Sequence, residues 1–172
     1  MKTPLPNSST RLVVALAIAF GLSVSRSNDN PVFYIQYGHA RIASILRRAT
    51  GLDPRAGDVS QLTEEPELAL IRKMLQFPEV VEAAAEAREP HQLPYYAREL
   101  AGVFTQFYES CRVFTREDLD VLAAGRLDDL SDRARSEARL KLALAAKTVL
   151  ANCLRLMGMS APEQMERKAA DE

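Results

Sequence analysis

Apolar residues recur at steps of three and four along most of the chain after residue 30, and this period predicts amphipathic helices. The first expected helix begins at Pro31, where a missing N–H costs no hydrogen bond, and Asn30 is placed to cap it. Gln36, Arg47 and Arg48 fall off the apolar stripe. That stripe consists of Val32, Ile35, Gly38, Ile42, Ile45, Leu46 and Ala49. One face of this helix is therefore expected to belong to a core.

Prolines divide the middle of the chain into three further expected helices. After a polar connection over 50–62, an acidic segment at 63–66 opens the first of them, which stops at Pro78. The second runs from Pro78 to Glu89. The third follows Pro94 and has the cleanest pattern. Its apolar positions are Leu93, Ala97, Leu100, Val103, Phe104, Phe107, Tyr108 and Cys111.

The last third of the chain predicts two short helical pieces and one long helix. The acidic segment 115–132 is divided by Gly125, and the long helix covers 133–157 until Gly158 stops it. Residues 160–163 have the spacing of a capping box for one final turn. No segment shows the alternation of a strand. The predicted fold class is all-α, a bundle of five to six helices.

Composition and charge narrow the function classes. The chain has 172 residues, of which 47% are apolar and 26% charged, and this balance excludes wholesale disorder and a multi-domain enzyme of usual size. The net charge of -1 hides a basic face on the last long helix. Arg133, Lys141, Lys147 and Arg155 share an arc of about 120° there. This arc is either a solvated face or a surface for nucleic-acid phosphates.

The search for catalytic or metal chemistry yields no candidate. The two cysteines have neither the spacing of a zinc site nor the number of a disulfide scaffold. His39 and His91 are far apart, and structural roles are expected for both. The sequence contains no glycine-rich phosphate loop and no nucleophile elbow. We therefore expect no catalytic residue, no metal and no cofactor in this chain.

The N-terminal residues 1–26 form a separate segment. Lys2 and Arg11 precede an apolar run over 12–24, which is typical of a signal peptide and too short to span a membrane. A divergent or artefactual N-terminus is the other interpretation, and it is the one adopted here. The expected domain organisation is this segment, a helical domain over 27–165 and a charged tail over 166–172.

Residues 27–42, SNDNPVFYIQYGHARI, closely resemble the segment of bacterial arginyl-tRNA synthetases that joins the catalytic domain to the C-terminal anticodon-binding bundle of DALR type. Stretches 107–113, 139–152 and 158–165 agree with the same family in order. The resemblance implies the helical anticodon-binding fold of a class I synthetase. It also implies a truncated form, because the family's catalytic domain, which uses ATP, is absent.

The resemblance implies arginine tRNA as the partner and aromatic residues that stack on anticodon bases. Carried over by position, the tRNA-binding candidates are Tyr34, Tyr37, Tyr108, Arg112 and Met165, and the basic arc adds Lys141 and Lys147. Core packing is the alternative role for Tyr108, and Tyr37 and Arg41 could brace each other.

The function expected from this resemblance is anticodon-loop binding of arginine–tRNA ligase type, which serves arginyl-tRNA aminoacylation in the cytoplasm when joined to a catalytic domain. Two alternatives stay open. One is a truncated paralogue that acts as an interaction module on a catalytic synthetase chain, and the other is an exported helical protein. No membrane association is expected.

Overall fold

The computed structural model describes residues 31–165, and this part of the chain contains helices and loops but no strand. The expected signal-like segment, the Asn30 cap and the charged tail lie outside the described residues. The elements are α2 (Pro31–Arg48), η1 (Val59–Gln61), α3 (Glu65–Leu75), α4 (Phe77–Ala87), α5 (Gln92–Ser110), α6 (Arg116–Ala123), η2 (Leu127–Asp129) and α7 (Arg133–Leu156). The prediction of an all-α bundle is confirmed.

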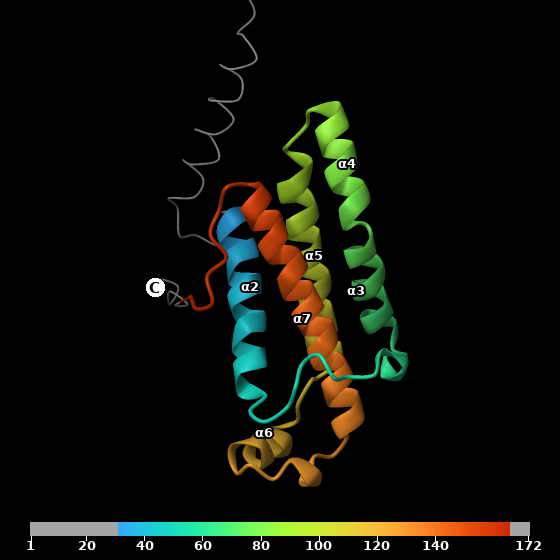
Figure 1. Cartoon of the computed structure of the whole chain (residues 1–172), viewed down its shortest axis with the longest axis vertical. Coiled ribbons are helices and arrows are strands. Elements are labelled where there is room, and N and C mark those ends of the chain that lie inside the picture. The colour runs from blue at the N-terminus through green and yellow to red at the C-terminus, as the bar shows by residue number, and fades with distance from the viewer. Residues whose placement is uncertain (1–30, 166–172) are drawn as a thin grey trace, which may run out of the picture.

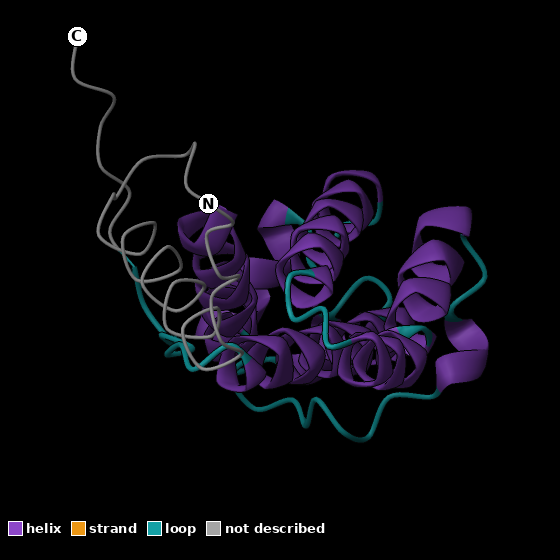
Figure 2. Cartoon of the chain, turned by 90° about the horizontal axis from the view of Figure 1, so that it is seen from above, coloured by secondary structure: helices purple, strands orange, loops and turns teal. Residues whose placement is uncertain are grey.

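Helices α2, α5 and α7 pack against one another, and α3 and α4 follow each other along α5 (Figure 1). Helix α6 and η2 lie at the end of the bundle where α5 ends and α7 begins. The view from above shows the helices packed around a common interior, with loops at the outside (Figure 2). Large side chains that are fully buried fill this interior, among them Ile35, Ile42, Leu100, Phe104, Phe107, Leu150 and Leu154. The apolar stripes expected from the sequence therefore form one core.

Helix α5 begins at Gln92, two residues before Pro94. The expected start after Pro94 is therefore wrong. The N–H groups of the first helical turn have no partner within a helix, so a proline at the third position removes no hydrogen bond. Pro94 is thus accommodated inside the helix that it was expected to precede.

The connection between α2 and α3 crosses α7 at Gly57. A Cβ atom at this position would overlap the backbone carbonyl of Glu137 in α7. The Nζ of Lys141 donates a hydrogen bond of 3.0 Å to the Gly57 carbonyl oxygen. This close approach requires glycine, because any side chain would push the connection away from the helix.

Helix α7 ends at Leu156, and Gly158 just beyond it has a φ of 73°, the left-handed conformation expected of a glycine that stops a helix. The final turn expected after it is absent: residues 161–165 are not helical. Instead the segment 159–165, here called the strap, runs beside α2 (Figure 1). Long side chains of α2 and α7 bind its polar groups and so replace the local bonds of a capping box.

Candidate nucleic-acid interface

One face of α2 carries an aromatic and basic stripe. Its members follow one another at alternating steps of three and four, so they lie within an arc of about 80° on the helix. We call Tyr34, Tyr37, Arg41, Ser44 and Arg48 the α2 stripe. All five side chains are at least partly accessible. The Tyr37 ring stacks on Phe33 with 6.5 Å between the ring centroids, and Tyr34 packs partly against the core.

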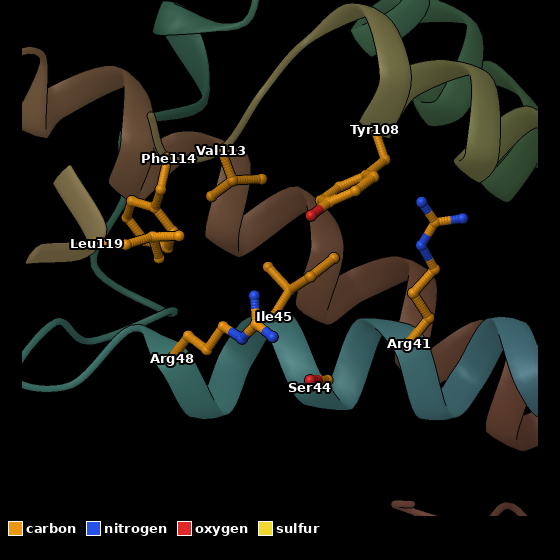
Figure 3. Close-up of a pocket in the computed structure, with 8 residues that line it drawn as sticks. All are labelled: Arg41, Ser44, Ile45, Arg48, Tyr108, Val113, Phe114 and Leu119. Atoms are coloured by element: carbon orange, nitrogen blue, oxygen red, sulfur yellow. The ribbon is translucent and has the colours of Figure 1, made fainter. Parts of the chain in front are cut away.

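The basic half of the α2 stripe borders a pocket of about 200 Å³. The pocket lies between α2, the end of α5 and the segment that leads into α6. Figure 3 shows Arg41 and Arg48 reaching from α2, with Tyr108 opposite them on α5. The complete lining is Arg41, Ser44, Ile45, Arg48, Tyr108, Val113, Phe114 and Leu119.

Tyr108 forms one wall of this pocket and is half-buried. The guanidinium carbon of Arg41 lies 4.7 Å from the centroid of the Tyr108 ring, which is the geometry of a cation–π contact. The ring also stacks on Phe104, with 6.3 Å between centroids. Tyr108 therefore combines partial core packing with partial exposure, and its contact with RNA stays a prediction.

The positive charges at the pocket are uncompensated within residues 31–165. No carboxylate of the described chain forms an ion pair with Arg41, Arg48 or Arg112. Arg112 is exposed just after α5, and its carbonyl oxygen accepts a hydrogen bond of 2.8 Å from Arg139. Unpaired arginines beside aromatic rings are suited to an anionic ligand with flat, stackable groups, such as single-stranded RNA.

The basic arc of α7 differs from the pocket because each of its four side chains is bound within the chain. Lys141 binds the Gly57 carbonyl, and Lys147 lies 2.7 Å from the carboxylate of Glu163. Arg133 pairs with Glu137 at 2.9 Å, and Arg155 donates to the Asn152 side chain. Contact of Lys141 and Lys147 with RNA stays a prediction, and these internal bonds compete with RNA for the two lysines.

Met165 lies at the end of the strap and is partly buried. The strap is held by Gln36, His39 and Arg47, which project from α2 about 100–180° away from Arg41 and Arg48. The structure therefore separates the predicted tyrosines from Met165. Tyr34, Tyr37 and Tyr108 gather on the α2 stripe and its pocket, while Met165 belongs to the strap.

Sequence reasoning missed Arg41, Ser44 and Arg48 as members of the candidate site. The signal was present, because the spacing of Tyr34 and Tyr37 continues through all three residues. Only the packing of α5 against α2 shows that this spacing ends beside Tyr108.

The remaining candidate chemistry is structural. His39 is buried, and its Nδ1 lies 2.9 Å from the Pro162 carbonyl oxygen. Cys111 and Cys153 are free, and burial raises the pKa of the Cys153 thiol to about 12. Within residues 31–165 no three potential ligands gather as a metal site. No helix in that range is long and apolar enough to cross a membrane.

Two curated proteins resemble this chain in sequence. The arginine–tRNA ligase of Dehalococcoides mccartyi is 48% identical over 147 residues, which are 84% of this chain and 24% of that protein. The arginine–tRNA ligase of Salinibacter ruber is 43% identical over 147 residues, with the same coverage of 84% and 24%. The chain spans about a quarter of the length of these curated relatives.

Solved structures agree in fold. The structure of Thermus thermophilus arginyl-tRNA synthetase superimposes with a TM-score of 0.61 and 36% sequence identity, over 82% of this chain and 22% of that one. Residues 35–165 match the family model described as the DALR anticodon binding domain. That match includes four of the five α2-stripe residues, the pocket and the strap. The chain therefore belongs to the DALR anticodon binding domain family.

Proposed function

We propose that residues 31–165 bind the anticodon loop of arginine tRNA and so supply the tRNA-binding part of arginyl-tRNA aminoacylation. The observation that carries this proposal is the α2 stripe. Its two tyrosines and two arginines follow one another along the helix to the Tyr108 pocket, and no carboxylate within residues 31–165 pairs with either arginine. The choice of arginine tRNA is supported by the names of the longer relatives.

The chemistry of the stripe fits an unstacked RNA loop. Bases that leave the stack of an RNA loop find new partners on aromatic rings and guanidinium planes, and each such contact is worth about 1–3 kcal/mol. Tyr34, Tyr37 and Tyr108 supply rings. Arg41 and Arg48 supply positive charge for the phosphates, while Arg112 lies just beyond Tyr108 along the chain.

In this proposal the chain binds RNA but activates no amino acid by itself. ATP and the catalytic step belong to a further domain or chain, and the site of action is the cytoplasm, where tRNA is charged. The chain's own residues position the anticodon loop and leave the acceptor end of the tRNA to that partner.

The test is tRNA binding by the purified chain, measured with transcripts of arginine tRNA and of an unrelated tRNA. We expect tighter binding of arginine tRNA and no exchange of pyrophosphate into ATP in the presence of arginine. Equal affinity for both transcripts would contradict the proposed specificity, and measurable exchange would contradict the division of labour.

A matched pair of variants locates the interface. Arg41→Gln and Arg72→Gln each remove one positive charge, but Arg41 is on the α2 stripe and Arg72 pairs with Glu65 on α3. Arg41→Gln should flatten the plot of log affinity against log salt by roughly 0.7, the value for one phosphate contact to a single strand. Arg72→Gln should leave the slope unchanged. Equal effects would move the RNA contact away from the stripe.

A second candidate function is docking on a separate catalytic synthetase chain. The observation in its favour is a pair of exposed apolar side chains at the end of the bundle where α5 begins and α7 ends. Tyr95 is 64% exposed there and Leu156 is 55% exposed. Co-purification with a full-length synthetase, compared with the double variant Tyr95→Ser/Leu156→Ser, would separate this function from direct RNA binding.

A further inference from the structure

The strap is bound to the bundle by a set of side chains that all come from α2 and α7. Gln36 Nε2 donates a hydrogen bond of 2.9 Å to the Ser160 carbonyl, and Arg47 donates one of 2.8 Å to the Glu163 carbonyl. His39, buried between them, lies 2.9 Å from the Pro162 carbonyl. Three side chains of α2 thus bind three carbonyls of the strap in the same order along both segments.

Helix α7 adds the only ion pair that the strap makes within residues 31–165. Lys147 Nζ lies 2.7 Å from the Glu163 carboxylate. The lysine side chain is 20% exposed and the glutamate side chain 60% exposed. The hydrogen bond from Lys147 lowers the pKa of the Glu163 carboxyl, so the carboxylate is ionised at neutral pH. The positive charge of Lys147 is therefore already directed at a partner within the chain.

This geometry couples the strap to the proposed RNA surface. Gln36, His39 and Arg47 lie on the same helix as the α2 stripe, on a different face. When the strap binds them, it fixes the position of α2 in the bundle, and α2 in turn exposes its stripe to the solvent. The strap also ends in Met165, so the same bonds determine where that side chain lies.

We infer that Lys147 is a positioning residue that does not itself contact RNA phosphates. It holds Glu163 and thereby fixes the positions of the strap and α2 for RNA binding. This inference rests on the proposed function. It predicts that Lys147 and Glu163 act as one unit, whereas a phosphate contact would make Glu163 a competitor of RNA for the lysine.

The two possibilities give opposite signs for one substitution. If Lys147 holds the strap through Glu163, Glu163→Gln removes one of the bonds that hold the strap, loosens it and weakens RNA binding. If Lys147 binds a phosphate, Glu163→Gln removes a competing negative charge and strengthens RNA binding. The experiment therefore compares Lys147→Gln, Glu163→Gln and the reversed pair Lys147→Glu/Glu163→Lys in the full chain.

Two measurements are needed for each variant: affinity for the arginine tRNA transcript as a function of salt, and amide hydrogen exchange of residues 159–165 without RNA. We expect both single variants to speed exchange in the strap and to weaken RNA binding about two- to fivefold, the range of one exposed ion pair. The reversed pair should restore both properties, and the salt slope should stay that of the wild type.

A closely matched control is available in the same bundle. Lys73 and Glu99 form an ion pair of 2.6 Å between α3 and α5, with side chains 18% and 65% exposed. Glu99→Gln should leave both strap exchange and RNA affinity unchanged. An equal effect of Glu99→Gln would show that general loss of stability, rather than the strap, weakens binding.

Stronger RNA binding by Glu163→Gln, or a flatter salt slope for Lys147→Gln, would overturn the inference and make Lys147 a phosphate contact. Unchanged strap exchange in both single variants would overturn it as well. If the wild-type chain shows no affinity for any tRNA, the proposed function fails, and the role of Lys147 in RNA binding fails too. The exchange measurement would then still show whether the ion pair holds the strap.

Discussion

Glu67 in α3 and Arg139 in α7 form a buried ion pair, with 2.6 Å between the Arg139 Nε and a Glu67 carboxylate oxygen. The side chains are 0% and 12% exposed. The other carboxylate oxygen of Glu67 accepts the backbone N–H of Glu64 at the start of α3, and Arg139 also donates to the Arg112 carbonyl. This pair therefore connects two helices and fixes the turn that leads from Tyr108 into the pocket wall.

Replacing one partner of this pair should destabilise the fold strongly. Arg139→Leu leaves the Glu67 carboxylate buried without its counter-charge, and we expect the free energy of unfolding to fall by about 3–5 kcal/mol. Adding Glu67→Gln should recover part of the loss, because the unpaired charge is then gone. Urea denaturation of the two variants measures both effects, and a loss below about 1 kcal/mol for Arg139→Leu would contradict the structural role of the pair.

Tyr108 should contribute to RNA binding through its ring rather than its hydroxyl. We expect Tyr108→Ala to weaken binding of the arginine tRNA transcript by about 1–3 kcal/mol, and Tyr108→Phe to bind nearly as tightly as the wild type. Thermal melts must accompany the binding measurements, since the ring also packs on Phe104. If Tyr108→Ala lowers only the melting temperature and binding per folded molecule is unchanged, the ring serves the core alone.

Asp118 should make stability depend on pH in the acidic range. Its carboxylate accepts hydrogen bonds from the backbone N–H and the hydroxyl of both Thr115 and Ser131. Burial raises the pKa of Asp118, but these hydrogen bonds outweigh burial, and the pKa lies below the ordinary value of 3.8. The carboxylate therefore stabilises the fold fully above pH 3.8, and this contribution is lost as the pH falls through the lowered pKa.

The substitution that tests this is Asp118→Asn, which places an amide N–H donor against the N–H and hydroxyl donors of Thr115 and Ser131. We expect it to cost about 1–3 kcal/mol at pH 7 and progressively less below pH 4. Asp120→Asn is the control, because Asp120 is exposed on the same short helix. Denaturant titrations at several pH values give the comparison, and a cost for Asp118→Asn that does not change with pH would show that ionisation is not its source.

Two glycines should respond to alanine in opposite directions. Gly57→Ala should destabilise by about 2 kcal/mol or more, because its Cβ would overlap the Glu137 carbonyl in α7. Gly102→Ala lies inside α5, where the new Cβ has no atom within 4 Å beyond its own stretch of helix, and it should stabilise by about 0.5–1 kcal/mol. Thermal unfolding of the two variants is sufficient as a measurement. A stable Gly57→Ala variant would mean that the connection does not need its close approach to α7.

The helices could be predicted from the sequence because their apolar positions repeat locally. The apolar positions from Val32 to Ala49 and the helix stop at Gly158 could be predicted without information about the rest of the chain. The start of α5 was predicted too late, because Pro94 was interpreted as a break although a first-turn position tolerates it.

Long-range bonds explain what the sequence could not show. The spacing of Ser160 and Glu163 predicts a local capping box, but Gln36 and Lys147 bind these two residues from other helices. The same limit applies to the site. The sequence resemblance predicts Tyr34, Tyr37 and Tyr108, whereas Arg41 and Arg48 belong to the candidate site only because α5 packs beside them.

The strap also determines when this fold can be completed during synthesis. Helix α2 is the first described helix to leave the ribosome, yet its partners Ser160, Pro162 and Glu163 are among the last described residues to be made. Of the two long helices that pack against α2, α5 is made midway and α7 is also late. The helix that carries the proposed RNA-binding stripe can pack on α5 earlier, but the part of its apolar face that α7 covers stays unburied until nearly the whole described chain has been translated. RNA-binding competence should accordingly arise after translation of the domain rather than helix by helix.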